Sequence, residues 1–120
     1  MTLSTHSQLL RELVARFNER QSIEVERYFA PNFQLRQPGG RDRAGLAGAR
    51  DMIDALVALG EQVHLRILAM VEQDDHVAVR WQVEGLQAGA AAAMMGIYRF
   101  EAGLIVEDWG LAVGAPWPGE

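Results

Sequence analysis

The sequence predicts an α+β domain in which three helices from the first half of the chain pack on a curved sheet, antiparallel or mixed, formed largely by the second half. Two observations lead to this prediction. Apolar residues recur at helical spacing up to residue 60 and at every second position after residue 62. The chain has 120 residues, 49% of them hydrophobic, which is enough for one domain with a buried core over residues 1–120.

The first half is expected to hold three helices and one strand. An amphipathic helix should end near Glu19, because apolar residues recur before it at helical spacing: Leu9, Leu10, Leu13, Val14 and Phe17. Ser22 is a candidate N-cap for a short second helix, which Pro31 would end. A strand over 33–36 and a third helix over 46–60 complete this half.

The second half is expected to form two hairpins joined by a short connection over 87–93. Apolar residues alternate over 63–71 and 77–83, on either side of a turn at Asp74 and Asp75. This turn pairs Val71 with Val77, Ile67 with Trp81 and Leu65 with Val83. All of these residues except Val71, together with Val79, would form an apolar face that is too large to leave in water, which favours association of two copies through it.

The last hairpin places a carboxylate on an apolar strand face. A turn from Glu101 to Leu104, in which Gly103 can adopt a positive φ, would pair Phe100 with Ile105, Tyr98 with Glu107 and Gly96 with Trp109. One face then carries Glu107 among aromatic side chains. A carboxylate in such surroundings is costly unless it is paired or protonated.

Two interpretations of Glu107 follow from this placement. Burial beside Tyr98 and Trp109 would raise the pKa of the carboxyl towards neutrality and suit it to proton transfer. A buried ion pair with Arg80 would explain the same sequence as a structural feature. The sequence does not separate the two.

The composition excludes several kinds of chemistry. The chain has no cysteine and no lysine, so thiolate catalysis, disulfides and Schiff bases are excluded. Its three histidines lack metal-ligand spacing, and we expect neither a metal nor a cofactor. A net charge of −5 argues against nucleic acid. Without a secretory pattern or an apolar run of about 18 residues, a cytoplasmic protein that does not enter membranes is expected.

Several segments, in the same order and spacing, resemble the SnoaL-like polyketide cyclases within the nuclear-transport-factor-2-like fold. The segment 99–109, RFEAGLIVEDW, is similar to the family's R-F-x-x-G-K-I-x-E-x-W ending, with Leu104 in place of the usual lysine. Residues 77–85, VAVRWQVEG, are similar to its central strand, and Phe17-Asn18 and 28–31, YFAP, to its helical opening. The resemblance implies a cone-shaped pocket and, in many members, a homodimer through the outer face of the sheet.

The resemblance also implies a set of site residues. In the resemblance, Glu107 matches the acid/base residue of the cyclases, and Arg80 and Gln82 would bind the ligand. The pattern of the chain itself makes Tyr98 and Trp109, beside Glu107 on the hairpin, and Tyr28 candidates for ligand binding as well. The resemblance turns Arg80 and Gln82 into the pocket and Trp81 onto the dimer face, whereas simple alternation along the strand would bury Trp81 instead. The chain departs from known catalytic sets of the fold at Gly96, Gln37 and Gln82.

Two classes of function remain open at this stage. The first is a SnoaL-like protein that binds a small hydrophobic molecule and acts on it as a cofactor-independent isomerase, cyclase or hydrolase. The second is a noncatalytic ligand-binding or dimeric assembly module of the same fold, which the departures at Gly96, Gln37 and Gln82 favour.

Overall fold

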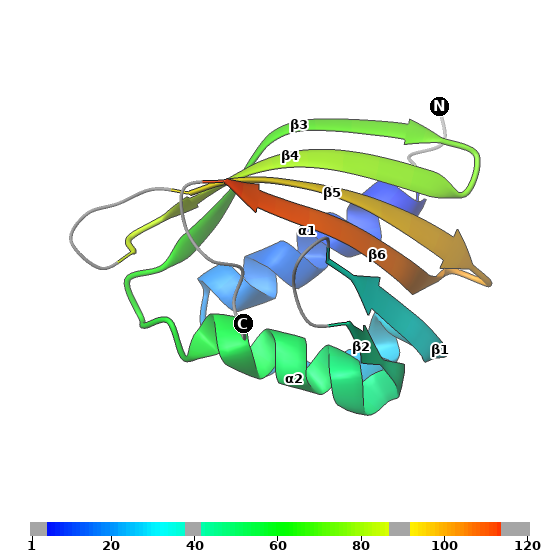
Figure 1. Ribbon diagram of the computed structural model, residues 1–120, viewed down its shortest axis with the longest axis horizontal. Coiled ribbons are helices and arrows are strands. Elements are labelled where there is room, and N and C mark those ends of the chain that lie inside the picture. The colour runs from blue at the N-terminus through cyan, green and yellow to red at the C-terminus, as the bar shows by residue number, and fades with distance from the viewer. Residues whose placement is uncertain (1–4, 38–41, 87–91, 114–120) are drawn as a thin grey trace.

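The computed structural model describes residues 5–37, 42–86 and 92–113, which form two α-helices, one 3-10 helix and a six-stranded mixed sheet. The elements are α1 (Thr5–Asn18), η1 (Val25–Arg27), β1 (Phe29–Arg36), β2 (Arg43–Ala44), α2 (Gly45–Val57), β3 (His64–Gln73), β4 (His76–Glu84), β5 (Ala92–Glu101) and β6 (Leu104–Val113). The strand order is β2-β1-β6-β5-β4-β3, and only β1 and β6 run parallel. Both α-helices lie on the same face of the sheet (Figure 1). None of the described helices is both long and apolar enough to cross a membrane.

The expected helix after Ser22 is reduced to the single 3-10 turn η1, so the described residues contain two α-helices where three helices were predicted. Glu24, before the turn, already has an extended backbone with φ −87° and ψ 106°. The backbone carbonyl of Tyr28 accepts a hydrogen bond from the N–H of Ile105 on β6, at 2.8 Å. Because the sheet uses this carbonyl and Pro31 favours extended backbone before it, β1 begins at Phe29, earlier than predicted.

The β3–β4 hairpin has most of the predicted pairs. Ile67 lies opposite Trp81 and Leu65 opposite Val83, as expected. The expected pairing of Val71 with Val77 is wrong, because a two-residue turn pairs Val71 with Ala78. An irregularity between residues 67 and 69 then restores the predicted pairing further along the strands.

The apolar face of this hairpin is turned towards the helices and away from the outside of the sheet. Its buried residues are Leu65, Val77, Val79, Trp81 and Val83, each 8% exposed or less. The expectation that these side chains form an outer, dimer-forming face is therefore wrong. They pack in the core with Leu10, Phe17 and Ile53 from the two helices. The alternation of the strand was the correct guide, and Trp81 is buried as it predicts.

Helix α1 is hydrogen-bonded to β3 at both of its ends. At its start, the Glu72 carboxylate accepts hydrogen bonds from the backbone N–H and the hydroxyl of Ser7, at 3.1 and 2.6 Å. Next to it, the His6 ring stacks on Phe100 at 4.4 Å. At its end, the Asn18 amide donates to the carbonyl of Leu65 and accepts from its N–H, both at 2.9 Å. These contacts hold α1 over the inner face of the sheet.

We expect Asn18→Ala to lower the free energy of unfolding by about 1–3 kcal/mol, because it leaves two backbone groups of Leu65 without their partner. Urea unfolding followed by circular dichroism measures this loss. The control is Asn32→Ala, at an exposed asparagine of β1, which should stay within about 0.5 kcal/mol of wild type. Equal effects of the two substitutions would contradict the role of Asn18.

Candidate functional site

An apolar cavity of about 60 Å³ lies between the two helices and the inner face of the sheet. The residues around it come from α1, α2 and five strands: Leu10, Leu13, Val14, Phe17, Phe29, Met52, Ile53, Leu56, Leu65, Trp81, Met94, Tyr98, Ile105 and Asp108. Only three of these side chains carry polar atoms, namely Trp81, Tyr98 and Asp108. Any polar chemistry in the cavity therefore involves these three.

Strand β6 contains a β-bulge that decides which carboxylate faces the cavity. Phe100 pairs with Ile105, as the sequence predicts. The next pair is Arg99 with Glu107, so Val106 is an extra residue on β6. Because side chains alternate between the two faces of a strand, one extra residue exchanges the faces of all residues that follow.

Beyond the bulge, Tyr98 lies opposite Asp108. The expected pairs of Tyr98 with Glu107 and of Gly96 with Trp109 are both wrong by one residue. As a result Asp108 lines the cavity, whereas Glu107 and Trp109 lie on the outer face. The buried carboxylate that the sequence predicts for the last strand exists, but at the neighbouring position.

Asp108 is a buried acid in apolar surroundings. Its side chain belongs to a residue that is only 3% exposed, and its Oδ1 atom has no hydrogen-bond partner among the described residues. Burial disfavours the charged form and raises the pKa of Asp108 from 3.8 to about 7. At neutral pH both protonation states are therefore populated, as a residue that gives and takes protons requires.

Tyr98 is placed next to this acid by the absence of a side chain at Gly96. A Cβ atom at Gly96 would lie 2.9 Å from the Tyr98 hydroxyl oxygen, so the phenol leans over the glycine. Burial and the nearby Asp108 raise the pKa of Tyr98 well above its ordinary value. Tyr98 therefore keeps its proton and can act as a hydrogen-bond donor. The ligand-binding position expected for Tyr98 lies in the cavity wall.

Trp81 completes the polar part of the wall. Its ring packs edge-to-face on Tyr98 with the centroids 6.2 Å apart. The indole N–H of Trp81 is buried, and its interaction with the Tyr98 hydroxyl opposes the rise in the pKa of that phenol. Buried polar atoms without partners are uncommon in proteins, which makes Asp108 Oδ1 the unusual polar atom of this cavity wall.

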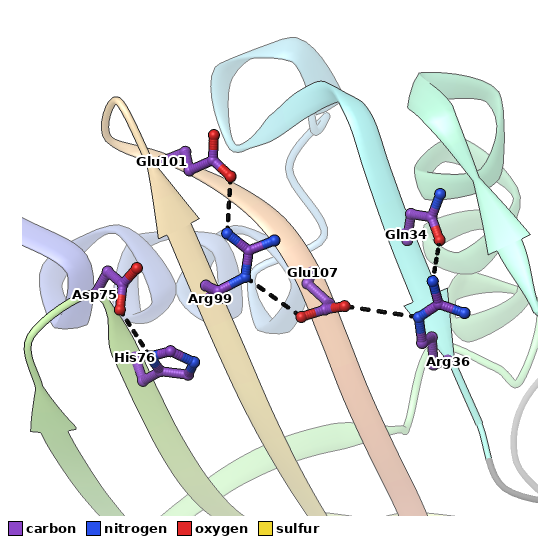
Figure 2. Close-up of polar contacts among 7 residues, drawn as sticks. All are labelled: Gln34, Arg36, Asp75, His76, Arg99, Glu101 and Glu107. Carbon is purple, nitrogen blue, oxygen red and sulfur yellow. Dashed lines mark hydrogen bonds and ion pairs between the residues drawn. The ribbon is translucent and has the colours of Figure 1, made fainter.

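Glu107 belongs to an ionic cluster on the outer face of the sheet (Figure 2). Its carboxylate lies 3.4 Å from Nε of Arg99 and 3.6 Å from Nε of Arg36. Partial burial acts to raise its pKa, but hydrogen bonds from Trp109 and Arg99 and the charges of both arginines outweigh it and hold the pKa below the ordinary value. The predicted ion pair with Arg80 is wrong, since the partners are Arg99 and Arg36. The catalytic role expected of Glu107 stays a prediction, but the side chain does not lie on the inner face from which that role was inferred.

The other predicted ligand-binding residues lie outside the cavity. Arg80 is exposed and Gln82 half-buried, on the strand β4 whose buried residues face the helices. Trp109 is 49% exposed on the outer face, with the Arg36 guanidinium 5.8 Å from its ring. Tyr28 is fully buried, but it lines a separate hollow beside Arg27. Of the predicted set, the structure brings only Tyr98 to the cavity.

The described residues contain no group of three or more histidine, cysteine or acidic side chains that could hold a metal ion. The same part of the chain brings Asp108, Tyr98 and Trp81 together. The arrangement can therefore bind a neutral apolar molecule, donate a hydrogen bond to it and exchange a proton with it.

We expect the stability of the protein to fall as the pH rises from about 4 to about 7, and Asp108→Asn to remove this fall. The folded protein keeps the Asp108 proton up to about pH 7, whereas the unfolded chain releases it near 3.8. Folding thus takes up a proton in this range, so raising the pH favours unfolding. A pKa difference of about three units corresponds to about 4 kcal/mol. The difference in unfolding free energy between Asp108→Asn and wild type should therefore change by about this amount, in favour of the variant, as the pH rises from 4 to 8; urea titrations measure it.

Glu107→Gln is the matched control, because the same reasoning predicts the opposite direction. The lowered pKa of Glu107 stabilises the fold above the pKa of the unfolded chain, and this stabilisation is lost as the pH falls. The Gln variant should be less stable than wild type at pH 7, by about 1 kcal/mol, and should approach it near pH 4. If the Asp108→Asn difference does not change with pH, the assignment of Asp108 as a buried acid is wrong.

Comparison with known proteins assigns this chain to a family. Residues 10–108 match the family model of the SnoaL-like domain. No curated protein matches the chain by sequence. An NTF2-like protein of unknown function from Mesorhizobium loti has a similar structure, with a TM-score of 0.79, 18% identity and 92% of both chains covered.

Two further solved structures are similar over nearly their whole length. A protein from Jannaschia sp. CCS1 assigned to the SnoaL-like polyketide cyclases has a TM-score of 0.76 and 12% identity, with 93% of this chain and 90% of that chain covered. A protein from Agrobacterium tumefaciens assigned as an isomerase of the SnoaL-like family has a TM-score of 0.74 and 17% identity, with 93% and 100% covered. At these identities the likeness concerns the fold. The chain belongs to the SnoaL-like family and has the NTF2-like fold.

Proposed function

We propose that this protein binds a small, largely apolar molecule between its helices and its sheet and catalyses a cofactor-independent proton transfer on it. Asp108 is the residue that moves the proton, and Tyr98 is the hydrogen-bond donor that orients the molecule. The proposal replaces Glu107 with Asp108 as the acid/base residue and keeps the type of chemistry expected from the sequence.

The observation that carries this proposal is the burial of Asp108 in an otherwise apolar cavity. A carboxyl group at 3% exposure without a partner for Oδ1 destabilises the fold at neutral pH. Such costly groups are typical of functional sites, where the perturbed pKa is useful. A purely structural carboxylate would have a cationic partner, as Glu107 has in Arg36 and Arg99.

The pair can perform an isomerisation or an aldol-type reaction by one common first step. The Asp108 carboxylate removes a proton from the carbon next to a ketone, and the electron pair of the C–H bond moves to form an enolate. The Tyr98 hydroxyl donates a hydrogen bond to the oxygen that gains the charge. Asp108 then returns the proton to another carbon. In the aldol-type reaction the enolate carbon instead attacks a second carbonyl, and the oxygen of that carbonyl takes the proton from Asp108, which regenerates the carboxylate.

The relatives are consistent with this class of reaction, since one is assigned to the polyketide cyclases and another as an isomerase. The cavity of about 60 Å³ is smaller than a typical ligand site of about 300–1,000 Å³. A large ligand therefore requires the cavity to widen, and the cone-shaped pocket expected from the family is proposed as the widened form.

The test is proton exchange on a small ketone. Wild-type protein should accelerate the exchange of the α-protons of 2-butanone in D2O, followed by NMR as loss of the proton signals. Asp108→Asn should reduce this acceleration at least about 100-fold, because it removes the base. Glu107→Gln should leave it within about twofold, since Glu107 lies on the outer face.

The alternative function, a noncatalytic ligand-binding module, predicts a different outcome. It is favoured by the departures at Gly96 and Gln37 from known catalytic sets of the fold. If 2-butanone shifts the methyl signals of the cavity residues Met52 and Met94 without any exchange, the protein is a binder and the catalytic proposal is wrong.

We also propose that the protein is a homodimer, formed through the outer face of β5 and β6. Four large apolar side chains lie on neighbouring positions of these strands, each between 48% and 57% exposed: Met95, Ile97, Trp109 and Leu111. An apolar patch of this kind is uncommon on a monomer. It takes the place of the apolar β3–β4 face on which the expectation of a dimer was first based.

Ile97→Glu should convert the dimer to a monomer, because it places a charge in the middle of this patch. Sedimentation velocity should show the dissociation constant rising at least about tenfold, which corresponds to about 1.4 kcal/mol. Val57→Glu is the control, at an exposed valine of α2. A wild-type protein that sediments as a monomer at high micromolar concentration would overturn the dimer.

A further inference from the structure

A second hollow opens on the surface beside the cavity, where the end of α1 meets α2. Its volume is about 470 Å³, several times that of the cavity. The residues around it come from the end of α1, the segment that follows it and α2: Phe17, Arg20, Gln21, Ser22, Ile23, Arg50, Ile53, Asp54 and Val57. We refer to this hollow as the helix-end groove. It is more polar than the cavity and carries charged side chains.

The helix-end groove and the cavity share two walls, Phe17 and Ile53. Phe17 lies in the last turn of α1 and is 3% exposed, and Ile53 lies in α2 and is 4% exposed. Among the described residues, no other side chain lines both hollows. These two side chains therefore separate the large outer hollow from the small inner one.

The charges of the groove favour an anion. Arg20 donates to four backbone carbonyls, those of Phe17, Gly60, Glu61 and Val63, so its guanidinium is fixed in the wall and contributes its charge to the groove. Arg50 donates to the carbonyl of Ile23 at 2.8 Å and has Nε 3.3 Å from Asp54. Two guanidinium groups face one carboxylate, which leaves one positive charge in excess. A carboxylate is the simplest group that matches it.

We propose that the helix-end groove is the outer half of the ligand site, where the carboxylate head of an elongated ligand lies near Arg50 while its apolar end passes Phe17 and Ile53 into the cavity. This inference rests on the proposed function in one respect, which is that the cavity receives the ligand. It specifies the class of substrate as an aliphatic carboxylic acid, with the reacting ketone in the chain that reaches Tyr98 and Asp108.

The size of the cavity supports a narrow chain. Its volume of about 60 Å³ is less than half of the about 150 Å³ known to hold a benzene ring in a dry engineered cavity. An aliphatic chain is thinner than a ring and can continue outwards into the larger groove. The polar head then stays where solvent and arginine side chains can reach it, and no charge enters the apolar interior.

The test uses methionine methyl NMR with octanoate and 1-octanol as a charged and an uncharged probe of the same length. Met52 and Met94 line the cavity, whereas Met95 lies on the outer face, in the proposed dimer interface, so the signals show which site is occupied. Octanoate should shift Met52 and Met94 and leave Met95 unchanged. Arg50→Gln should weaken octanoate binding about fivefold, and 1-octanol binding should change by less than twofold.

Two control variants separate a specific site from a general effect. Arg66→Gln removes an exposed arginine of β3 that does not line the groove and should leave octanoate binding unchanged. Arg50→Lys keeps the charge and should restore most of the affinity, which also shows that the loss in Arg50→Gln is not a folding defect. Equal weakening by Arg50→Gln and Arg66→Gln would overturn the role of the groove.

The rate of binding tests whether the ligand passes the wall that Phe17 and Ile53 form between the groove and the cavity. Ile53→Val removes one methylene from the shared wall and should speed the association of octanoate about threefold or more. Ile105→Val removes the same group from a residue that lines the cavity only, and should not change the association rate. Equal rates in the two variants would show that the ligand takes another way in.

The outcomes distinguish this inference from the proposed function. If 1-octanol shifts Met52 and Met94 and octanoate does not, the groove is not a carboxylate site and the inference is wrong, while the cavity remains a ligand site. If neither probe shifts these two signals, the cavity does not receive apolar chains, and both the inference and the proposed binding site are wrong.

Discussion

The bulge at Val106 is the constraint on which the candidate site depends. One extra residue in β6 turns Glu107 outwards and Asp108 inwards. Without it, Glu107 would enter the apolar cavity and Asp108 would lie on the outer face. The outer cations Arg36 and Arg99 would then have to pair with a shorter side chain. The bulge therefore provides both a satisfied outer ion cluster and an unsatisfied inner acid.

Two adjacent carboxyl groups thus have opposite electrostatic environments. Glu107 is held in its charged form by arginines, and burial favours the neutral form of Asp108. The first contributes to stability at neutral pH and the second reduces it. Because the two residues are neighbours on one strand, the difference comes only from the face on which each side chain lies. Unfavourable acids of this kind in a protein interior are typical of functional sites.

The architecture could be predicted from the sequence, but the identity of the buried acid could not. The change from helical to alternating spacing predicted α1, α2 and the two hairpins, but it also predicted a helix after Ser22 where the structure has a single 3-10 turn. Alternation along β4 correctly buried Trp81. The family resemblance reversed that assignment and placed Arg80 inside. In β6, Val106 is apolar like Ile105, and both following residues are acidic, so no pattern reveals the one-residue shift. In the sequence, only the presence of two adjacent acidic residues, Glu107 and Asp108, indicated that either of them could face inwards.

The way into the cavity depends on how the helices are held. Helix α1 is tied to β3 by Glu72 at its start and by Asn18 at its end, so lifting it would break several hydrogen bonds at once. The wall formed by Phe17 and Ile53 consists of apolar side chains, and moving a side chain between rotamers breaks no hydrogen bond. Side-chain rotations are also much faster than movements of whole helices. Rotation of Phe17 would cost its contact with the Arg20 guanidinium, which lies 4.8 Å from the ring. We infer that the cavity opens through this wall, towards the helix-end groove.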